Sequence, residues 1–267
     1  MLRPTMTEVK ASHSLGAPLE NKVVLVTGAS SGIGRAIASA CARAGADIAT
    51  TFHTSQANAE AVAAEARSRG RRALVIRCDV ARQEDLDQLA AQVRREFGRV
   101  DAWINNAGVD ILTGQASRLT RIEKLDRLIA VDLRGTMLAS WTAAEIMKGQ
   151  PGGGTIINMS WDGVLQGLEG ENPQLFAAVK GGVASFSRSL ARSLAPRIRV
   201  NVLGPGWIET AFGESVDAAF KRRISEKIPL KRWGTPEDVA GVAVFLASDA
   251  AGYLTGQTIT INGGEVM

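Results

Sequence analysis

The segment that most constrains the fold is residues 23–44, where a short apolar run, a glycine-rich turn and an alanine-rich stretch follow one another. Residues 23–26 are apolar and mostly β-branched, which predicts a strand buried on both faces of a parallel sheet. Gly28, Gly32 and Gly34 then allow a sharp turn and a close approach to a phosphate. The stretch that follows predicts a helix, whose first N–H groups attract an anion. The segment therefore predicts a diphosphate site, although the same pattern also occurs in turns that bind nothing.

The rest of the chain alternates strand-like and helix-like segments. Strands are expected at 47–52, 73–80, 100–105, 155–159, 198–203 and 257–261, and helices at 55–69, 83–97, 122–147 and 174–194. This βαβ order predicts an α/β fold, a Rossmann-type doubly wound parallel sheet of seven strands with helices on both faces. At 267 residues, 45% of them hydrophobic, the chain is expected to form one dinucleotide-binding domain over residues 21–267, after a flexible arm at 1–20.

Composition argues against several function classes. The net charge of +4 comes from scattered arginines with only short clusters, such as residues 221–223, so we expect solvated helix faces and no nucleic-acid partner. The sequence has no apolar run of membrane-spanning length, and residues 1–20 do not resemble a signal peptide. Cys41 and Cys78 lack metal-ligand spacing and are expected to be reduced core thiols. We therefore expect a cytoplasmic protein without a metal or membrane partner, acting on a small molecule.

Four segments carry a family resemblance. Residues 27–34 have the sequence TGASSGIG, residues 105–108 are NNAG, Asp79 and Val80 end the third predicted strand, and residues 205–210 begin with Pro-Gly. Together they resemble the short-chain dehydrogenase/reductase family, in particular members similar to 3-oxoacyl-acyl-carrier-protein reductases. The resemblance extends from about residue 19 to residue 264. All four segments lie at the carboxyl ends of predicted strands, where ligands bind in such sheets.

The resemblance implies that a nicotinamide dinucleotide binds along these segments. In the family, the residue that matches Asp79 meets the adenine amino group, and the loop that matches residues 205–210 holds the nicotinamide carboxamide. The implied cofactor-binding residues are Gly28, Ser30, Ser31, Gly32, Ile33, Gly34, Asp79, Val80, Asn106, Ala107, Gly108, Lys180, Pro205, Gly206, Ile208 and Thr210.

The end of the second predicted strand bears on which dinucleotide binds. An acidic residue there would bind the ribose 2′-hydroxyl of NAD and repel a 2′-phosphate. No Asp or Glu occurs at residues 48–59, and Phe52 takes the expected place of the acid, followed by His53, Thr54 and Ser55. Room for a phosphate beside hydroxyl groups and His53 favours NADP(H) over NAD(H), with His53 as a further cofactor-binding residue. Alternatively, Thr54 and Ser55 only cap the next helix.

The catalytic positions depart from the family pattern. Family chemistry depends on an Asn, a Ser and a Tyr-x-x-x-Lys pair, in which the lysine lowers the pKa of the tyrosine that exchanges the alcohol proton during hydride transfer. Here Phe176 and Lys180 occupy the last two positions, and Asp132 stands at the Asn position. Trp161 occupies the Ser position and follows Ser160, although a shifted register would restore Ser160 to that role. Only the lysine is plainly present.

Two function classes therefore stay open. One is an oxidoreductase for a carbonyl or alcohol substrate in which Ser160, Asp162, Glu209 or water supplies the proton. General acid–base catalysis contributes roughly 10²–10⁴-fold, so its loss does not abolish hydride transfer. The other is a catalytically silent NADP-binding protein that acts as a partner or sensor. Lys180 fits both, because in the family it also binds the nicotinamide ribose, and the sole tyrosine, Tyr253, is expected to pack near the last strand.

Aromatic residues and long apolar helices suggest a pocket and an assembly. Four aromatic residues are expected either to form a pocket for a flat or apolar substrate or to belong to the core: Trp161, Trp207, Phe212 and Phe220. The predicted helices at 122–147 and 174–194 are apolar over much of their surface. In the family, such helices form a four-helix seam across a two-fold axis, which implies a homo-oligomer, a tetramer or a dimer.

Overall fold

The computed structural model describes residues 17–164 and 166–266. They form a seven-stranded sheet in the order β3-β2-β1-β4-β5-β6-β7, with every neighbouring pair parallel. The strands are β1 (Val23–Val26), β2 (Asp47–Phe52), β3 (Ala73–Arg77), β4 (Ala102–Asn105), β5 (Gly154–Met159), β6 (Ile198–Pro205) and β7 (Thr258–Ile261). The predicted seven-stranded, doubly wound parallel sheet is confirmed.

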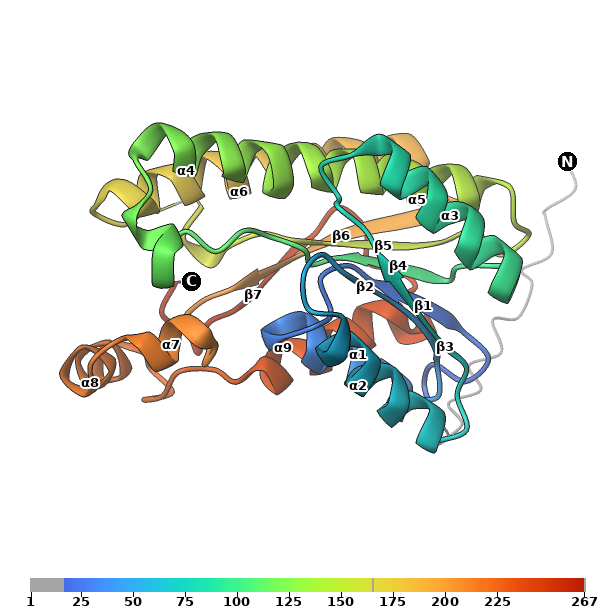
Figure 1. The fold of residues 1–267 in the computed structure, drawn as a ribbon, viewed down its shortest axis with the longest axis horizontal. Coiled ribbons are helices and arrows are strands. Elements are labelled where there is room, and N and C mark those ends of the chain that lie inside the picture. The colour runs from blue at the N-terminus through green and yellow to red at the C-terminus, as the bar shows by residue number, and fades with distance from the viewer. Residues whose placement is uncertain (1–16, 165, 267) are drawn as a thin grey trace, which may run out of the picture.

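Helices cover both faces of this sheet (Figure 1). On one face lie α1 (Gly32–Arg43), α2 (Gln56–Ser68) and α9 (Pro236–Ala247), with α1 packed along α9. On the other lie α3 (Gln83–Phe97), α4 (Arg121–Leu128), α5 (Thr136–Lys148) and α6 (Glu171–Leu194). Short 3₁₀ turns occur at Gly114–Arg118, Asp162–Val164 and Asp249–Ala251.

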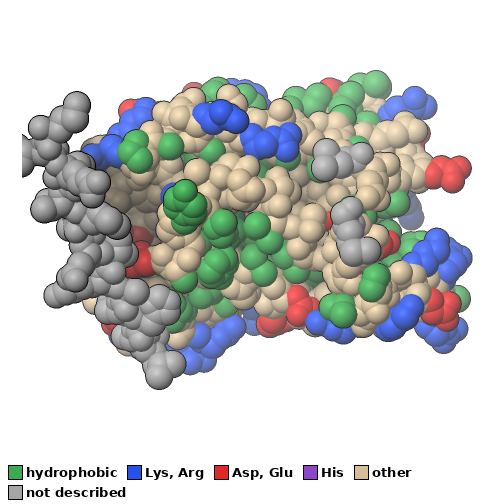
Figure 2. All heavy atoms as spheres, turned by 180° about the vertical axis from the view of Figure 1, so that it is seen from behind, with side chains coloured by type: hydrophobic (Ala, Val, Ile, Leu, Met, Phe, Trp, Pro, Cys, Tyr) green, Lys and Arg blue, Asp and Glu red, His purple; other side chains and the backbone are tan. Residues whose placement is uncertain are grey.

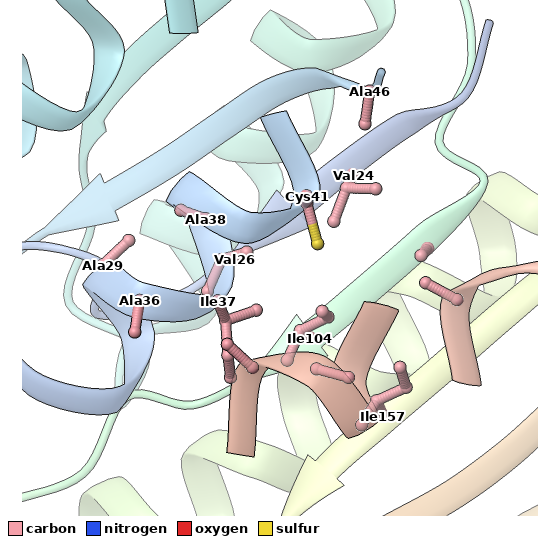
Figure 3. Close-up of a cluster of buried hydrophobic side chains, with 14 of the residues drawn as sticks. Val24, Val26, Ala29, Ala36, Ile37, Ala38, Cys41, Ala46, Ile104 and Ile157 are labelled. Atoms are coloured by element: carbon pink, nitrogen blue, oxygen red, sulfur yellow. The ribbon is translucent and has the colours of Figure 1, made fainter. Parts of the chain in front are cut away.

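The side chains of β1 divide between two hydrophobic cores. Val24 and Val26 belong to the core beneath α1 and α9, and Val23 and Leu25 belong to the core beneath α3, α5 and α6. Figure 3 shows Ile37 and Cys41 of α1 close to the valines of β1. Because each face of β1 is covered, the strand needs apolar residues at every position, as the sequence predicts.

The predicted helix over residues 122–147 is interrupted. Between α4 and α5 the chain forms a π-helical segment, Ile129–Gly135, with an i→i+5 pattern. A Cβ atom at Gly135 would lie 2.9 Å from the Cγ2 atom of Val80 and 3.1 Å from its carbonyl oxygen, so a glycine is needed where this segment passes the end of β3. The prediction of one regular helix is therefore wrong at its centre, and the wider turn carries Asp132, which is buried.

The packed domain begins before residue 21. Leu19 is fully buried, and its N–H donates to the carbonyl oxygen of Ala44 at 2.8 Å. Glu20 pairs with Arg71 at 2.8 Å. The expected arm at 1–20 thus includes packed residues at its end, and residues 1–16 lie outside the described part of the chain.

The sequence pattern indicated no helix between β6 and β7, where the structure has α9 and, before it, two short helices, α7 (Ala211–Ser215) and α8 (Ala218–Lys227). Helices α7 and α8 lie beyond the carboxyl ends of the central strands (Figure 1). Tyr253, which was expected to pack near β7, is fully exposed instead.

Both cysteines are free and buried, as predicted. Burial raises the pKa of Cys41 and of Cys78 to about 12, so neither thiol is reactive near neutral pH. Within residues 17–164 and 166–266, no group of three or more potential metal ligands is present. None of the described helices is both long and apolar enough to cross a membrane.

Candidate functional site

The glycine-rich turn after β1 lies against the segment that follows β4. Gly28 has φ +64°, and a Cβ atom there would lie 2.8 Å from the Cα atom of Ala107. A Cβ atom at Gly34 would overlap the side chain of Asn106 and the carbonyl oxygen of Gly28. Both glycines are therefore required by close backbone contact, in addition to any role toward a phosphate.

Thr27 and Asn106 hold this turn together. The Thr27 hydroxyl oxygen accepts hydrogen bonds from the backbone N–H groups of Asn106 and Ala107, each at 3.0 Å. The Asn106 side-chain amide donates to the carbonyl oxygens of Thr27 and Gly28 at 3.0 and 3.1 Å. Sequence reasoning missed Thr27, although its place directly before the first glycine marks it as part of the motif.

His53 and Asp79 lie side by side at the carboxyl ends of β2 and β3, with His53 Nε2 4.0 Å from Asp79 Oδ2. Phe52 is buried, so the exposed position at this strand end is His53. The Arg77 Nε donates to the carbonyl oxygen of His53 at 3.4 Å, which adds a cation that the sequence did not indicate. Ser55 is the N-cap residue of α2 but makes no side-chain capping hydrogen bond.

A cavity of about 510 Å³ opens at the carboxyl ends of the central strands. Ten of the predicted site residues line it: Ile33, Asn106, Ser160, Trp161, Phe176, Lys180, Pro205, Gly206, Ile208 and Thr210. Trp207 and Phe212, which were expected in an aromatic pocket, line it as well, and residues that sequence reasoning did not assign complete the lining: Leu112, Met159, Leu168, Asn172 and Pro173. Other predicted site residues lie outside it, on the glycine turn, on the segment after β4, at the ends of β2 and β3, or behind the wall: Gly28, Ser30, Ser31, Gly32, Gly34, Ala107, Gly108, His53, Asp79, Val80 and Asp132.

Lys180 and Asp132 form a buried ion pair beside this cavity. Lys180 Nζ lies 2.7 Å from Asp132 Oδ2, and the two side chains are 11% and 3% exposed. The other oxygen of Asp132 accepts a hydrogen bond from the backbone N–H of Val109 at 2.9 Å. A Cβ atom on Gly108 would lie 2.8 Å from Asp132 Oδ2, so glycine is needed next to the carboxylate. Asp132 therefore acts on the site through Lys180, which lines the cavity.

Ser160, Trp161 and Phe176 come together around Lys180. The Ser160 hydroxyl donates to the carbonyl oxygen of Lys180 at 2.8 Å, so its proton is engaged with the backbone. Phe176 lies one helical turn before Lys180 on α6, so both side chains reach the same cavity. The ring of Trp161 packs over Gly163, where a Cβ atom would lie 2.5 Å from a ring carbon.

Aromatic residues of the β6–α9 segment form another wall. Trp207 stacks on Phe212 with ring centroids 6.2 Å apart, and Trp233 and Phe220 pack on Trp207 at 5.2 and 5.7 Å. Trp207 and Phe212 line the cavity, whereas Phe220 and Trp233 support them from behind. The expected aromatic pocket is thus present without Phe220 in its lining.

Two acids that the sequence offered as proton donors do not line the cavity. Glu209 pairs with Lys221. Asp162 is buried behind Gly206, where a Cβ atom would lie 2.9 Å from its Oδ2 atom. Burial raises the pKa of Asp162 to about 6, against a hydrogen bond from Asn262 that lowers it. The Oδ2 atom has no hydrogen-bond partner among the described residues.

Asp162 should make stability depend on pH. Because its pKa is higher in the folded protein than in the unfolded chain, the free energy of unfolding should fall as the pH rises from about 4 to about 6. Asp162→Asn should remove this fall and be more stable than the parent above pH 6. Thermal melting from pH 4 to pH 8 measures this difference.

Asp238 provides a control of opposite sign. Its hydrogen bonds with Arg232 lower its pKa to about 2, so it contributes stability that is present above pH 4 and lost in acid. Asp238→Asn should therefore be less stable than the parent at neutral pH. If Asp162→Asn also loses stability at neutral pH, the carboxylate of Asp162 has a partner that offsets its burial.

Comparisons with known proteins agree with this architecture. The family model described as Enoyl-(Acyl carrier protein) reductase matches residues 28–265. A 3-oxoacyl-[acyl-carrier-protein] reductase of Synechocystis sp. is 37% identical over 93% of this chain and 98% of its own length. L-rhamnose 1-dehydrogenase (NAD(P)(+)) of Sphingomonas sp. is also 37% identical, over 92% of this chain and 96% of its own.

Solved structures of short-chain dehydrogenases share this fold. A short chain dehydrogenase from Burkholderia cenocepacia, solved in complex with NADP, superposes with a TM-score of 0.84 at 32% identity, covering 93% of this chain and 99% of that one. The seven-stranded parallel sheet, the glycine turn held by Asn106 and the α6 lysine beside the cavity all accompany this similarity. The chain belongs to the short-chain dehydrogenase/reductase family, as an oxidoreductase-type member related to 3-oxoacyl-acyl-carrier-protein reductases and sugar dehydrogenases.

Proposed function

We propose that the protein is an NADP(H)-dependent oxidoreductase for a carbonyl or alcohol substrate, with an active site that lacks the usual tyrosine. The observation that carries this proposal is the cavity beside α6, where the Lys180 ammonium and the Phe176 ring lie one turn apart next to Trp161. The family's acid–base hydroxyl is replaced there by a ring without an exchangeable proton. Titration with NADPH, followed by turnover on a panel of ketones and alcohols, tests this proposal.

The proposed mechanism depends on position and electrostatics. A nicotinamide dinucleotide held along the predicted cofactor-binding segments would supply or accept the hydride. Asp132 fixes the ammonium of Lys180 at the edge of the cavity, where it would hold the nicotinamide ribose. Trp161, Phe176 and Trp207 exclude water and orient a substrate against the cofactor.

The preference for NADP(H) is supported by the end of β2. The sequence has no Asp or Glu at residues 48–59, and the exposed residue at the end of β2 is His53, so no acid of this strand end would repel a 2′-phosphate. Arg77 and His53 supply polar and cationic groups at the same edge. The Burkholderia cenocepacia protein, which shares the fold, was solved with NADP. These features support His53, Asp79 and Arg77 as residues around the adenosine end.

We expect the wild-type protein to bind NADPH at least tenfold more tightly than NADH, about 1.4 kcal/mol. Arg77→Ala should weaken NADPH binding about tenfold and leave NADH binding nearly unchanged, because only NADPH carries the 2′-phosphate. Cofactor fluorescence titration measures both affinities. Arg95→Ala, an exposed arginine in the last turn of α3, is the matched control. Tighter binding of NADH by the wild type would contradict this assignment.

The second candidate function is a catalytically silent NADP-binding partner or sensor. It is favoured by the engaged hydroxyl of Ser160 and by the missing phenol at Phe176. NADPH binding without turnover on any substrate would support it, whereas NADPH consumption would dismiss it. In either case, the two buried thiols without a disulfide support a cytoplasmic location.

We also propose a homo-oligomer, a dimer or tetramer, on the basis of exposed apolar side chains. Trp141 on α5 is 47% exposed and contacts Phe186 of α6 edge-on at 5.8 Å, and Ile129 is 41% exposed. On the face seen in Figure 2, hydrophobic side chains also gather near the centre. Such patches are typical of interfaces.

Light scattering should give a mass of two or four times the 28.2 kDa of the chain. Trp141→Glu should dissociate the assembly, because a carboxylate would be buried at the interface. Leu230→Glu, at a more exposed position near α8, is the control that should leave the mass unchanged. A stable monomer at micromolar concentration would contradict the proposal.

A further inference from the structure

Three of the polar side chains that line the cavity are engaged elsewhere. Asn106 donates to the glycine turn, and Ser160 donates to the backbone of α6. The side-chain oxygen of Asn172 accepts from Lys124 Nζ at 3.2 Å. Thr210 lies at the glycine turn, its methyl group 3.7 Å from the position of a Cβ atom on Gly32. Among the described lining residues, Lys180 is the one with an ionisable side chain, so it is the candidate acid for a product beside Phe176.

Lys180 is poorly suited to give up that proton. Its ammonium neutralises the carboxylate of Asp132, which is 3% exposed and 2.7 Å away. Loss of the proton would leave Asp132 as a buried charge with one backbone hydrogen bond, from Val109. The ammonium is therefore engaged with Asp132, and its use as a general acid would break the ion pair.

A hydride acceptor that needs no proton fits this arrangement. Hydride transfer to a carbonyl carbon leaves an alkoxide, which requires a proton donor. Hydride transfer to an iminium carbon does not: the C–H bond of the nicotinamide breaks, its electron pair forms the new C–H bond, and the π pair of the C=N bond becomes the nitrogen lone pair. The products are NADP⁺ and a neutral amine, so charge and electrons balance without an acid.

The wall of the cavity also suits an organic cation. Trp161, Phe176, Trp207 and Phe212 contribute aromatic rings, whose faces attract cations. The ammonium of Lys180 is paired, so an incoming cation meets no uncompensated positive charge. A volume of about 510 Å³ lies in the range of small-molecule sites. We propose that the substrate is a cyclic iminium ion fused to an aromatic ring, which NADPH reduces to the amine. This proposal rests on the proposed oxidoreductase function.

The test compares a two-ring N-methyl iminium ion, N-methyl-3,4-dihydroisoquinolinium, with a neutral two-ring ketone, 2-tetralone, by NADPH consumption. We expect kcat/KM for the iminium ion to exceed that for the ketone at least 100-fold, since general acid catalysis is worth about 10²–10⁴-fold and only the ketone needs it. The iminium reaction should show a solvent isotope effect close to unity. Phe176→Tyr should reduce the ratio by raising ketone turnover, and Tyr253→Phe, at the fully exposed tyrosine, should leave it unchanged.

Equal or faster turnover of the ketone would overturn the iminium proposal and leave the oxidoreductase proposal standing. NADPH binding without reduction of the iminium ion, or a large solvent isotope effect, would also overturn it. If NADPH does not bind at all, both proposals fail. Titration with NADPH alone distinguishes this result from the outcomes that overturn only the iminium proposal.

Discussion

Asp132→Ala is expected to lower the free energy of unfolding by about 3–5 kcal/mol, because it leaves the Lys180 ammonium buried without its partner. For a chain of this size, such a loss corresponds to a fall in melting temperature of about 10 °C. The backbone N–H of Val109 would lose its acceptor as well. Thermal and urea denaturation measure the change.

An exposed ion pair is the matched control. Lys148 and Glu145 lie 2.8 Å apart on α5 with 51% and 74% of their side chains exposed, so Lys148→Ala should cost less than about 1 kcal/mol. Asp132→Ala combined with Lys180→Met should recover much of the loss, since no lone charge remains buried. If Asp132→Ala costs no more than Lys148→Ala, the buried pair is solvated and does not hold Lys180 in place.

Phe176→Tyr combined with Trp161→Ser should create or raise ketone reduction by roughly 10²–10⁴-fold with NADPH. The new phenol would lie one turn from Lys180 and supply the exchangeable proton that Phe176 lacks, and the smaller serine would open space and bind the carbonyl oxygen. NADPH consumption with a panel of ketones gives the rates. Lys180→Ala in the parent should weaken cofactor binding.

Each single variant accompanies the double one, so that the effect of the new phenol is separated from the effect of the space opened at Trp161. Tyr253→Phe, which changes a phenol far from the cavity lining, controls for nonspecific effects. A double variant that binds NADPH well and stays inert would show that the catalytic positions are not those of Trp161 and Phe176. Parent rates near 1–10 s⁻¹ on ordinary ketones would show that another group supplies the proton.

Local patterns predicted most of the sheet and the helix after the glycine turn. The apolar run of β1 and the glycine spacing indicate their structures without knowledge of distant contacts. Helix α3 has the predicted bounds, 83–97. The π-helical turn could not be predicted, because it adds only one residue to a helical turn. The spacing of apolar residues over 122–147 still fits a regular helix when such an insertion is ignored. Helices α7 and α8 were missed because they are short and obtain their stability from the aromatic cluster around Trp207.

The candidate site was predictable where motifs are contiguous and not where contacts are distant. The spacing of Phe176 and Lys180 on one helix indicated that they share a face, and both line the cavity. The Asp132–Lys180 ion pair joins two helices, and Arg77 meets the backbone of His53 across neighbouring strands. No local pattern encodes such pairs. Because the contact between Asp162 and Gly206 is also distant in the sequence, Asp162 was predicted as a possible proton donor, although it lies behind Gly206.

The hydrogen bonds between Thr27 and Asn106 join positions 79 residues apart. The glycine turn therefore reaches its final shape only after β4 has docked beside β1, and closing so long a loop is slow relative to forming α1 or α2. An amino-terminal fragment that ends before β4 would contain every glycine of the motif and still lack its fixed geometry. The affinity for a nucleotide would thus appear late in folding, and its appearance would show that the central strands have assembled.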